Sequence, residues 1–182
     1  MIKMPADWST MREAGGDFPK LVPGGYVIII KKVTDFPEDN NQFIEIEYDV
    51  AEGELKHIAL DSYERFGSWN FKFRVYYRQK SLGFFKHFIS SVEKTNNGFT
   101  FDFNNVNCLV NKGLGIVVGI RQYYGNDGTL KSAPDVQDYC TAAEVREDKL
   151  PSTPKIREPR NAPPVQAVTA DDSSFDDGEL PF

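Results

Sequence analysis

The feature that most constrains this chain is a change in the spacing of its hydrophobic residues. Residues 43–50 alternate between apolar and acidic side chains, which predicts a half-buried β-strand with one wet, acidic face. Residues 69–77 alternate in the same way, so they predict a second such strand. Residues 80–94 instead have apolar side chains at helical spacing, which predicts an amphipathic helix. Three Phe of that helix, at positions 84, 85 and 88, are expected to lie in the core.

The remaining strands are predicted from β-rich runs and turn signals. Residues 26–33 follow a Pro-Gly-Gly turn, residues 54–60 are a candidate third strand, and residues 99–103, 116–124 and 136–143 return to strand character. The hairpin turn Gly125-Asn126-Asp127-Gly128 joins the last two strands. We therefore expect a mainly β protein, built as a five-stranded antiparallel OB-fold barrel with one helix between strands 3 and 4.

Composition divides the chain into four parts: an N-terminal extension (residues 1–20), an OB-fold domain (21–150), a linker (151–170) and a tail (171–182). The linker is rich in Pro and has no aromatic residue, so it cannot bury enough apolar surface to fold and is predicted to be disordered. The formal net charge is −6, but residues 161–182 hold acidic residues and no basic ones. The negative charge is thus concentrated at the C-terminus, where it suggests an interaction tail.

Residues 56–88 are rich in both bases and aromatic rings. Single-stranded nucleic acid offers base faces to aromatic rings and phosphates to Lys or Arg, and stacking on a ring tolerates any base. On one face of the predicted strand, Lys72, Arg74, Tyr76 and Arg78 form a basic row that includes one ring. Trp69, Phe71 and Phe73 are equally compatible with a core face and with a stacking platform. The predicted nucleic-acid-binding residues are Trp69, Lys72, Arg74, Tyr76, Tyr77, Arg78 and Lys80, with Tyr26, Lys31 and Lys32 as weaker candidates.

The C-terminal tail combines acids with an apolar end. A purely solvating tail needs no terminal Phe, so Phe182 favours a recognition peptide whose ring enters a partner's pocket while a base holds the carboxylate. The predicted partner-binding residues are Asp176, Asp177, Glu179, Leu180, Pro181 and Phe182.

That ending resembles the tail of bacterial single-stranded DNA-binding proteins, although Gly178 and Leu180 stand where that family usually has Asp and Ile. The body resembles the single-stranded DNA-binding proteins of bacteriophages and mobile elements of Gram-positive bacteria. The motifs that carry this resemblance are Pro23-Gly24-Gly25-Tyr26, Ile46-Glu47-Tyr48-Asp49, Arg65-Phe66-Gly67, Phe84-Phe85-Lys86-His87-Phe88-Ile89 and Tyr124-Gly125-Asn126-Asp127-Gly128. The resemblance implies an OB-fold, sequence-tolerant binding of single-stranded DNA, and a tail that recruits replication and recombination enzymes.

Two other functions are weighed against this one. A protein-interaction adaptor with an OB-like body is favoured by the mildly acidic charge of residues 1–150. A metal-dependent nuclease would use the acidic row Glu45, Glu47 and Asp49. His57, expected on an exposed strand, and His87, on the polar side of the helix, have no partner at metal-ligand spacing, and no phosphate-binding Gly-rich motif occurs. We therefore expect no enzymatic activity, no cofactor and no metal.

The same features set the expected surroundings of the protein. No apolar run is long enough for a membrane span or a signal peptide, and two Cys are too few for a disulfide scaffold, so the bacterial cytoplasm is the expected compartment. The expected partners are single-stranded DNA and replication or recombination proteins, and the sequence is compatible with a homo-oligomer.

Overall fold

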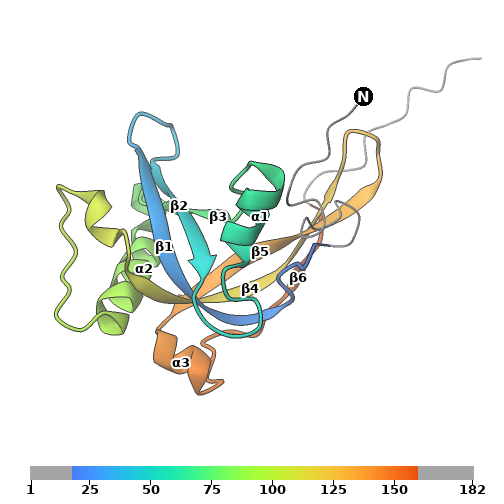
Figure 1. Cartoon of the computed structure of the whole chain (residues 1–182). Coiled ribbons are helices and arrows are strands. Elements are labelled where there is room, and N and C mark those ends of the chain that lie inside the picture. Colours follow the sequence, from blue (N-terminus) through green and yellow to red (C-terminus); the bar gives the residue numbers. More distant parts are fainter. Residues whose placement is uncertain (1–17, 160–182) are drawn as a thin grey trace, which may run out of the picture.

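One sheet organises the part of the chain that the computed structural model describes, residues 18–159 (Figure 1). Its antiparallel strands lie in the order β3-β2-β1-β4-β5, and a short sixth strand pairs with β4 in parallel. The strands are β1 (Gly24–Phe36), β2 (Phe43–Val50), β3 (Lys72–Tyr76), β4 (Gly113–Tyr124), β5 (Leu130–Cys140) and β6 (Ile156–Arg157). The protein is thus mainly β, as the sequence predicts.

Strand β1 is shared by two halves of the sheet. Its first residues, from Gly24 to Ile29, pair with β4, and its residues from Ile28 onward pair with β2. The register with β2 shifts between Ile30 and Lys32, so Lys31 is a bulge residue. Pairing with different partners at its two ends turns the sheet around the core. It leaves β3 and β5 as the two ends of the strand order.

The core lies between the inner strand faces and helix α2 (Leu82–Thr95), which comes between β3 and β4 in the chain. Fully buried side chains from the sheet include Ile28, Ile44, Ile46, Leu114 and Ile116. The ring of Phe88 in α2 is also fully buried and packs on Tyr139 of β5 and Phe73 of β3, with ring centroids 5.2 and 6.4 Å away. Helix α2 therefore fills the space between strands that are not paired with each other.

A helix replaces the strand predicted over residues 54–60. Helix α1 (Ile58–Phe66) begins after His57, which has a left-handed backbone (φ 67°) and is not the strand residue we expected. Asp49 explains this start, because its carboxylate accepts a hydrogen bond from the Ala59 N–H at 3.0 Å and lies 3.3 Å from the His57 ring. Asp49 is fully buried, so the wet acidic face predicted for β2 ends before this residue.

Three further expectations are corrected by the structure. Residues 99–103 form a loop, because the Phe101 N–H donates to the side chain of Glu93 at 2.9 Å and not to a neighbouring strand. Phe84 is 71% exposed, because in the first turn of α2 it is Phe85 that packs on Tyr77 and Phe101. Strand β5 begins at Leu130, earlier than predicted, because it pairs with β4 as far as the hairpin turn.

The end of the described chain also belongs to the sheet. After helix α3 (Ala142–Arg146), the chain returns along β4 and forms β6, although its composition predicts a linker there. No helix within these residues is long and apolar enough to cross a membrane.

We predict that Asp49→Ala lowers the free energy of unfolding by about 1–3 kcal/mol, because it leaves the buried Ala59 N–H without an acceptor. Chemical denaturation followed by circular dichroism measures this loss. The matched control is Glu47→Ala on the same strand, which removes only an exposed pair with Lys32 and is expected to change stability by less than about 1 kcal/mol. Equal stability of the two variants would contradict the capping role of Asp49.

Candidate nucleic-acid interface

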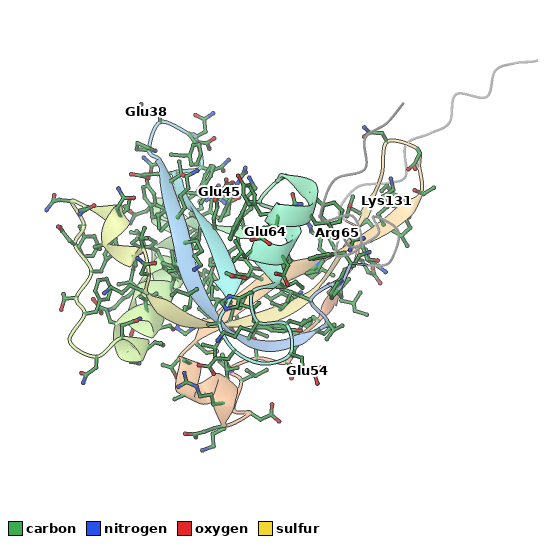
Figure 2. All side chains as sticks on the ribbon, viewed as in Figure 1. Glu38, Glu45, Glu54, Glu64, Arg65 and Lys131 are labelled. Atoms are coloured by element: carbon green, nitrogen blue, oxygen red, sulfur yellow. The ribbon has the colours of Figure 1, made fainter. Side chains whose placement is uncertain are left out.

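A wide groove opens between β3 and the far part of the β4–β5 hairpin, which extends to the right of the sheet in Figure 1. We call residues 119–135 of this hairpin the arm, and the space beside it the arm groove. The groove has a volume of about 1500 Å³. Its walls come from β3, from α1, from the arm and from the last described residues, 157–159. Figure 2 shows Glu45 on β2 and Lys131 on the arm, with α1 between them in this view.

The β3 wall follows the alternation predicted from the sequence. Lys72 and Arg74 are exposed and Tyr76 is half-buried, and all three line the groove, while Val75 points into the core. Phe73 is 9% exposed, so it belongs to the core and is not an open stacking platform. Three of the four residues of the predicted basic row, all but Arg78, therefore face an open groove.

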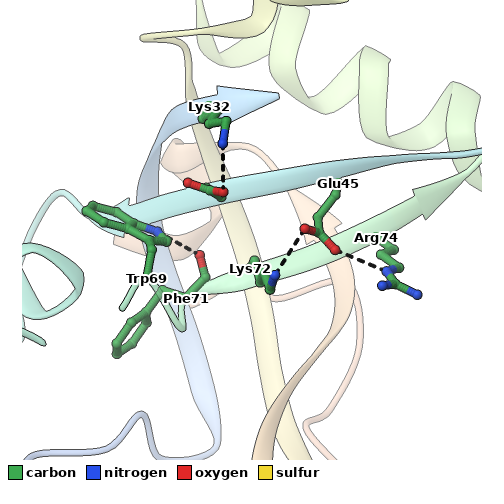
Figure 3. Close-up of polar contacts among 7 residues, drawn as sticks. Lys32, Glu45, Trp69, Phe71, Lys72 and Arg74 are labelled. Atoms are coloured by element: carbon green, nitrogen blue, oxygen red, sulfur yellow. Dashed lines mark hydrogen bonds and ion pairs between the residues drawn. The ribbon is translucent and has the colours of Figure 1, made fainter. Parts of the chain in front are cut away.

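A carboxylate holds the two bases of this row in place. Glu45 of β2 lies across from Arg74, and its oxygens accept from Lys72 Nζ at 3.1 Å and from Arg74 Nε at 3.2 Å (Figure 3). Partial burial raises the pKa of the Glu45 carboxyl, but the hydrogen bonds and charges of Lys72 and Arg74 outweigh it and hold the pKa below its usual value. Glu45 is therefore ionised at neutral pH and partly neutralises both bases.

Aromatic rings continue from the groove toward the β1–β2 hairpin. The guanidinium of Arg74 lies 4.5 Å from the centre of the Phe43 ring, and that of Arg78 lies 5.7 Å from the Tyr76 ring. Phe43 in turn packs on Tyr76 and on Phe36, with ring centroids 5.6 and 4.7 Å apart. Rings and cations thus alternate along one face of β2 and β3.

The groove is basic although the chain as a whole is acidic. Its lining includes five bases, Lys20, Lys72, Arg74, Arg121 and Arg157, and three acids, Glu45, Asp135 and Glu158. The charge of the site is thus opposite in sign to the net charge of −6. Clustering on one surface matters more for an anionic ligand than the sum over the chain.

Seven of the ten predicted binding residues do not line the arm groove, and four of these seven are Trp69, Tyr77, Tyr26 and Lys31. The indole N–H of Trp69 donates to the carbonyl of Phe71 at 3.1 Å (Figure 3), and Trp69 does not line the groove. The Tyr77 hydroxyl donates to Asp35 at 2.8 Å, and burial together with this bond raises its pKa to about 12. The Tyr26 hydroxyl bonds the backbone of Val22, and Lys31 occupies the bulge of β1.

The other three of the seven are Arg78, Lys32 and Lys80. Arg78 donates to the side chain of Asn41 at 2.8 Å, at the hairpin end of the face described above. Lys32 pairs with Glu47 at 3.4 Å, and Lys80 is exposed in the short turn η1 (Gln79–Ser81). None of these three lines the arm groove.

Several groove residues were missed by the sequence reasoning. Arg121 and Tyr123 are exposed on the arm, and Arg121 lies 6.0 Å from the centre of the Tyr123 ring. They alternate on one strand as Lys72 and Arg74 do, so the same pattern could have identified them. Arg157 lies in a Pro-rich stretch and carries no such signal.

The acidic row considered for metal chemistry is divided between different contacts. Glu45 is engaged by Lys72 and Arg74, Glu47 pairs with Lys32, and Asp49 is buried beneath α1. Within residues 18–159, no three His, Cys, Asp or Glu side chains lie close enough together to hold a metal ion. His87, predicted on the polar side of its helix, is exposed and bonds the carbonyl of Tyr139 at 2.8 Å.

The predicted docking tail, residues 171–182, lies outside the described residues, as do residues 160–170 of the predicted linker and most of the N-terminal extension. No protein family model matches the chain, and no curated protein is significantly similar to it.

We predict that Lys72→Ala and Arg74→Ala each raise the pKa of the Glu45 carboxyl, because each removes a cation that stabilises its ionised form. An NMR titration of the side-chain carboxyl signal measures this value. Because the folded-state pKa is lowered, the stability contributed by the pairing is present above the unfolded-state pKa and is lost as the pH falls.

The matched control is Lys32→Ala, which removes the partner of Glu47 and is expected to leave the Glu45 pKa unchanged. A Glu45 pKa that does not move in either of the first two variants would show that these ion pairs do not form in solution.

Proposed function

We propose that this protein binds single-stranded DNA without sequence preference, through the arm groove and the adjoining face of β2 and β3. The observation that carries the proposal is that two strands, each bearing basic and aromatic side chains, line the same groove. Lys72, Arg74 and Tyr76 approach from β3, while Arg121 and Tyr123 approach from the arm.

Part of the proposal is that the sheet forms an OB-type barrel. The strands follow the order expected for that fold, with α2 between β3 and β4. The rings of Phe73 and Tyr139 lie 5.7 Å apart, which brings β3 and β5 together at one end of the groove. Oligonucleotides bind OB-folds on the face of strands 2 and 3, between the loops joining strands 1–2 and 4–5. In such a barrel, the arm groove and the adjoining face of β2 and β3 would occupy these positions.

The chemistry of the groove fits an unpaired strand. Tyr76, Tyr123 and Phe66 present rings on which bases can stack, and stacking contributes about 1–3 kcal/mol per base for any base. Lys72, Arg74 and Arg121 can contact successive phosphates, and each contact adds to the salt dependence of binding. Base stacking and phosphate contact together account for affinity without a preferred sequence.

The C-terminal tail completes the proposal. The acids that precede Leu180-Pro181-Phe182 suit a peptide that a replication or recombination enzyme captures, and they steer its approach. Such a protein would coat single-stranded DNA and bring those enzymes to it in the bacterial cytoplasm, as the resemblance to phage and mobile-element proteins implies.

The adaptor hypothesis is supported by a different observation. Phe84 and Phe103 are 71% and 78% exposed, so apolar surface that another protein could cover lies outside the groove. An adaptor of this kind would need neither the basic groove nor salt-dependent binding of nucleic acid, which separates the two functions by experiment.

We predict that the protein binds a fluorescein-labelled oligo-dT, measured by anisotropy, with an affinity that falls steeply as salt rises. Arg74→Ala and Arg121→Ala are each expected to weaken binding and to reduce the slope of log affinity against log salt by about 0.7, the value of one contact to a single strand. Tyr123→Ala is expected to weaken binding by about 1–3 kcal/mol through loss of stacking.

The matched control is Lys86→Ala, which removes an exposed charge from the base-rich segment 56–88 but does not touch the groove. It is expected to bind like the wild type. Absence of binding at low salt would overturn the proposal and leave the adaptor hypothesis. Equal losses in Lys86→Ala and Arg74→Ala would show that binding follows net charge and not the groove.

A further inference from the structure

The residues that follow position 150 remain packed against the sheet, although their composition is that of a linker. After α3 and Leu150, residues 151–159 return along the arm, and we call them the strap. Within the strap, β6 pairs in parallel with β4, so that Ile156 lies beside Ile120 and Arg157 beside Arg121. The Ile120 N–H donates to the carbonyl of Lys155 at 3.0 Å. The strap therefore adds a short strand to the edge of β4 that β5 does not occupy, just beyond the residues that pair with β1.

One side chain of β5 also holds the strap. Gln137 of β5 donates through Nε2 to the carbonyl of Lys155 at 2.8 Å, and its Oε1 accepts from the Lys155 N–H at 3.0 Å. The amide thus bonds both backbone groups of one residue, as a neighbouring strand would. Gln137 is free to do so because the register of β4 and β5 shifts between Val117 and Val118, which leaves Gln137 as a bulge residue.

A glycine makes room for this contact. A Cβ added to Gly119 would lie 2.2 Å from Nε2 of Gln137 and 2.4 Å from the carbonyl oxygen of Lys155. Both distances are far below van der Waals contact, so any side chain at position 119 must displace the strap or Gln137. Gly119, Gln137 and Lys155 therefore form one packed unit of three chain segments.

The strap ends at the arm groove. Arg157, Glu158 and Pro159 line it, and Arg157 is paired with Asp135 at 3.1 Å. Because Arg157 is in register with Arg121, two guanidinium-bearing residues from neighbouring strands stand on the same wall.

We infer that Gln137 is a positioning residue, which ties the strap to the arm and so places Arg157 in the groove as a further phosphate contact. This inference rests on the proposed function for its phosphate role, but the attachment of the strap can be tested without nucleic acid. Gln137 is itself one of the residues that line the groove, but its side-chain amide is bonded to the backbone of Lys155. We therefore expect it to act by holding the strap in place.

Attachment is tested by limited trypsin digestion of the full-length protein, following cleavage after Lys155 and Arg157. Gln137→Ala removes both bonds to Lys155, and Gly119→Ala forces the segments apart, so each is expected to speed cleavage there at least severalfold. Cleavage after Lys94 in α2 is the internal control and should not change. Unchanged cleavage after Lys155 and Arg157 in both variants would overturn the role of Gln137.

The consequence for binding is tested with labelled oligo-dT at several salt concentrations. Arg157→Ala is expected to weaken binding roughly fivefold and to lower the salt slope by about 0.7. Gln137→Ala should reproduce both effects, and adding Arg157→Ala to it should weaken binding no further. A merely structural role of Gln137 would lower the melting temperature but leave the salt slope unchanged, and this result would overturn the inference, as would additive losses.

The two levels of failure are distinguishable. If the wild-type protein binds no oligo-dT while Gln137→Ala still speeds cleavage in the strap, the proposed function and the phosphate role of Arg157 fail, and the attachment stands. If Arg74→Ala weakens binding but Arg157→Ala does not, the proposed function stands and the placement of Arg157 as a phosphate contact is overturned.

Discussion

The structure depends above all on the pairing of β1 with two different strands. Its first half bonds β4 and its second half bonds β2, so one strand belongs to both halves of a turning sheet. The turn leaves β3 and β5 at the two ends of the strand order, with the Phe88 ring of α2 packed between them. The arm groove lies beside these same two strands, so the site follows directly from the curvature of the sheet.

Electrostatic balance within the groove is the second theme. Glu45 accepts from both Lys72 and Arg74, and Asp135 pairs with Arg157. These exposed pairs contribute little to stability, but they hold long side chains in defined positions beside the groove. In the function that we propose, a phosphate would compete with these carboxylates for the same cations.

Much of the fold could be predicted from the sequence because its signals are local. The alternation in β2 and β3, the helical spacing of α2 and the Asn-Asp-Gly turn each depend on neighbouring residues. Helix α1 could not be predicted in this way, since its start depends on Asp49, a residue on a different element. The loop at residues 99–103 likewise depends on the side chain of Glu93.

The residues of the candidate site also fall into those that a local pattern predicts and those that it does not. Lys72, Arg74 and Tyr76 were predicted because β3 alternates, whereas the orientation of Trp69 depends on a hydrogen bond to Phe71 that no pattern encodes. Arg157 reaches the groove only because Gln137, Gly119 and the bulge in β5 bind the strap there. Contacts between distant segments thus decide which of the many bases and rings share one surface.

The most direct test of the central claim is a map of amide hydrogen exchange on the full-length protein with and without saturating oligo-dT. The account predicts that protection increases in β3, in the arm and at Arg157, and that exchange around the exposed Phe84 and Phe103 stays unchanged. Protection confined to the surface around Phe84 and Phe103, or none at all under conditions where the oligonucleotide binds, would contradict it.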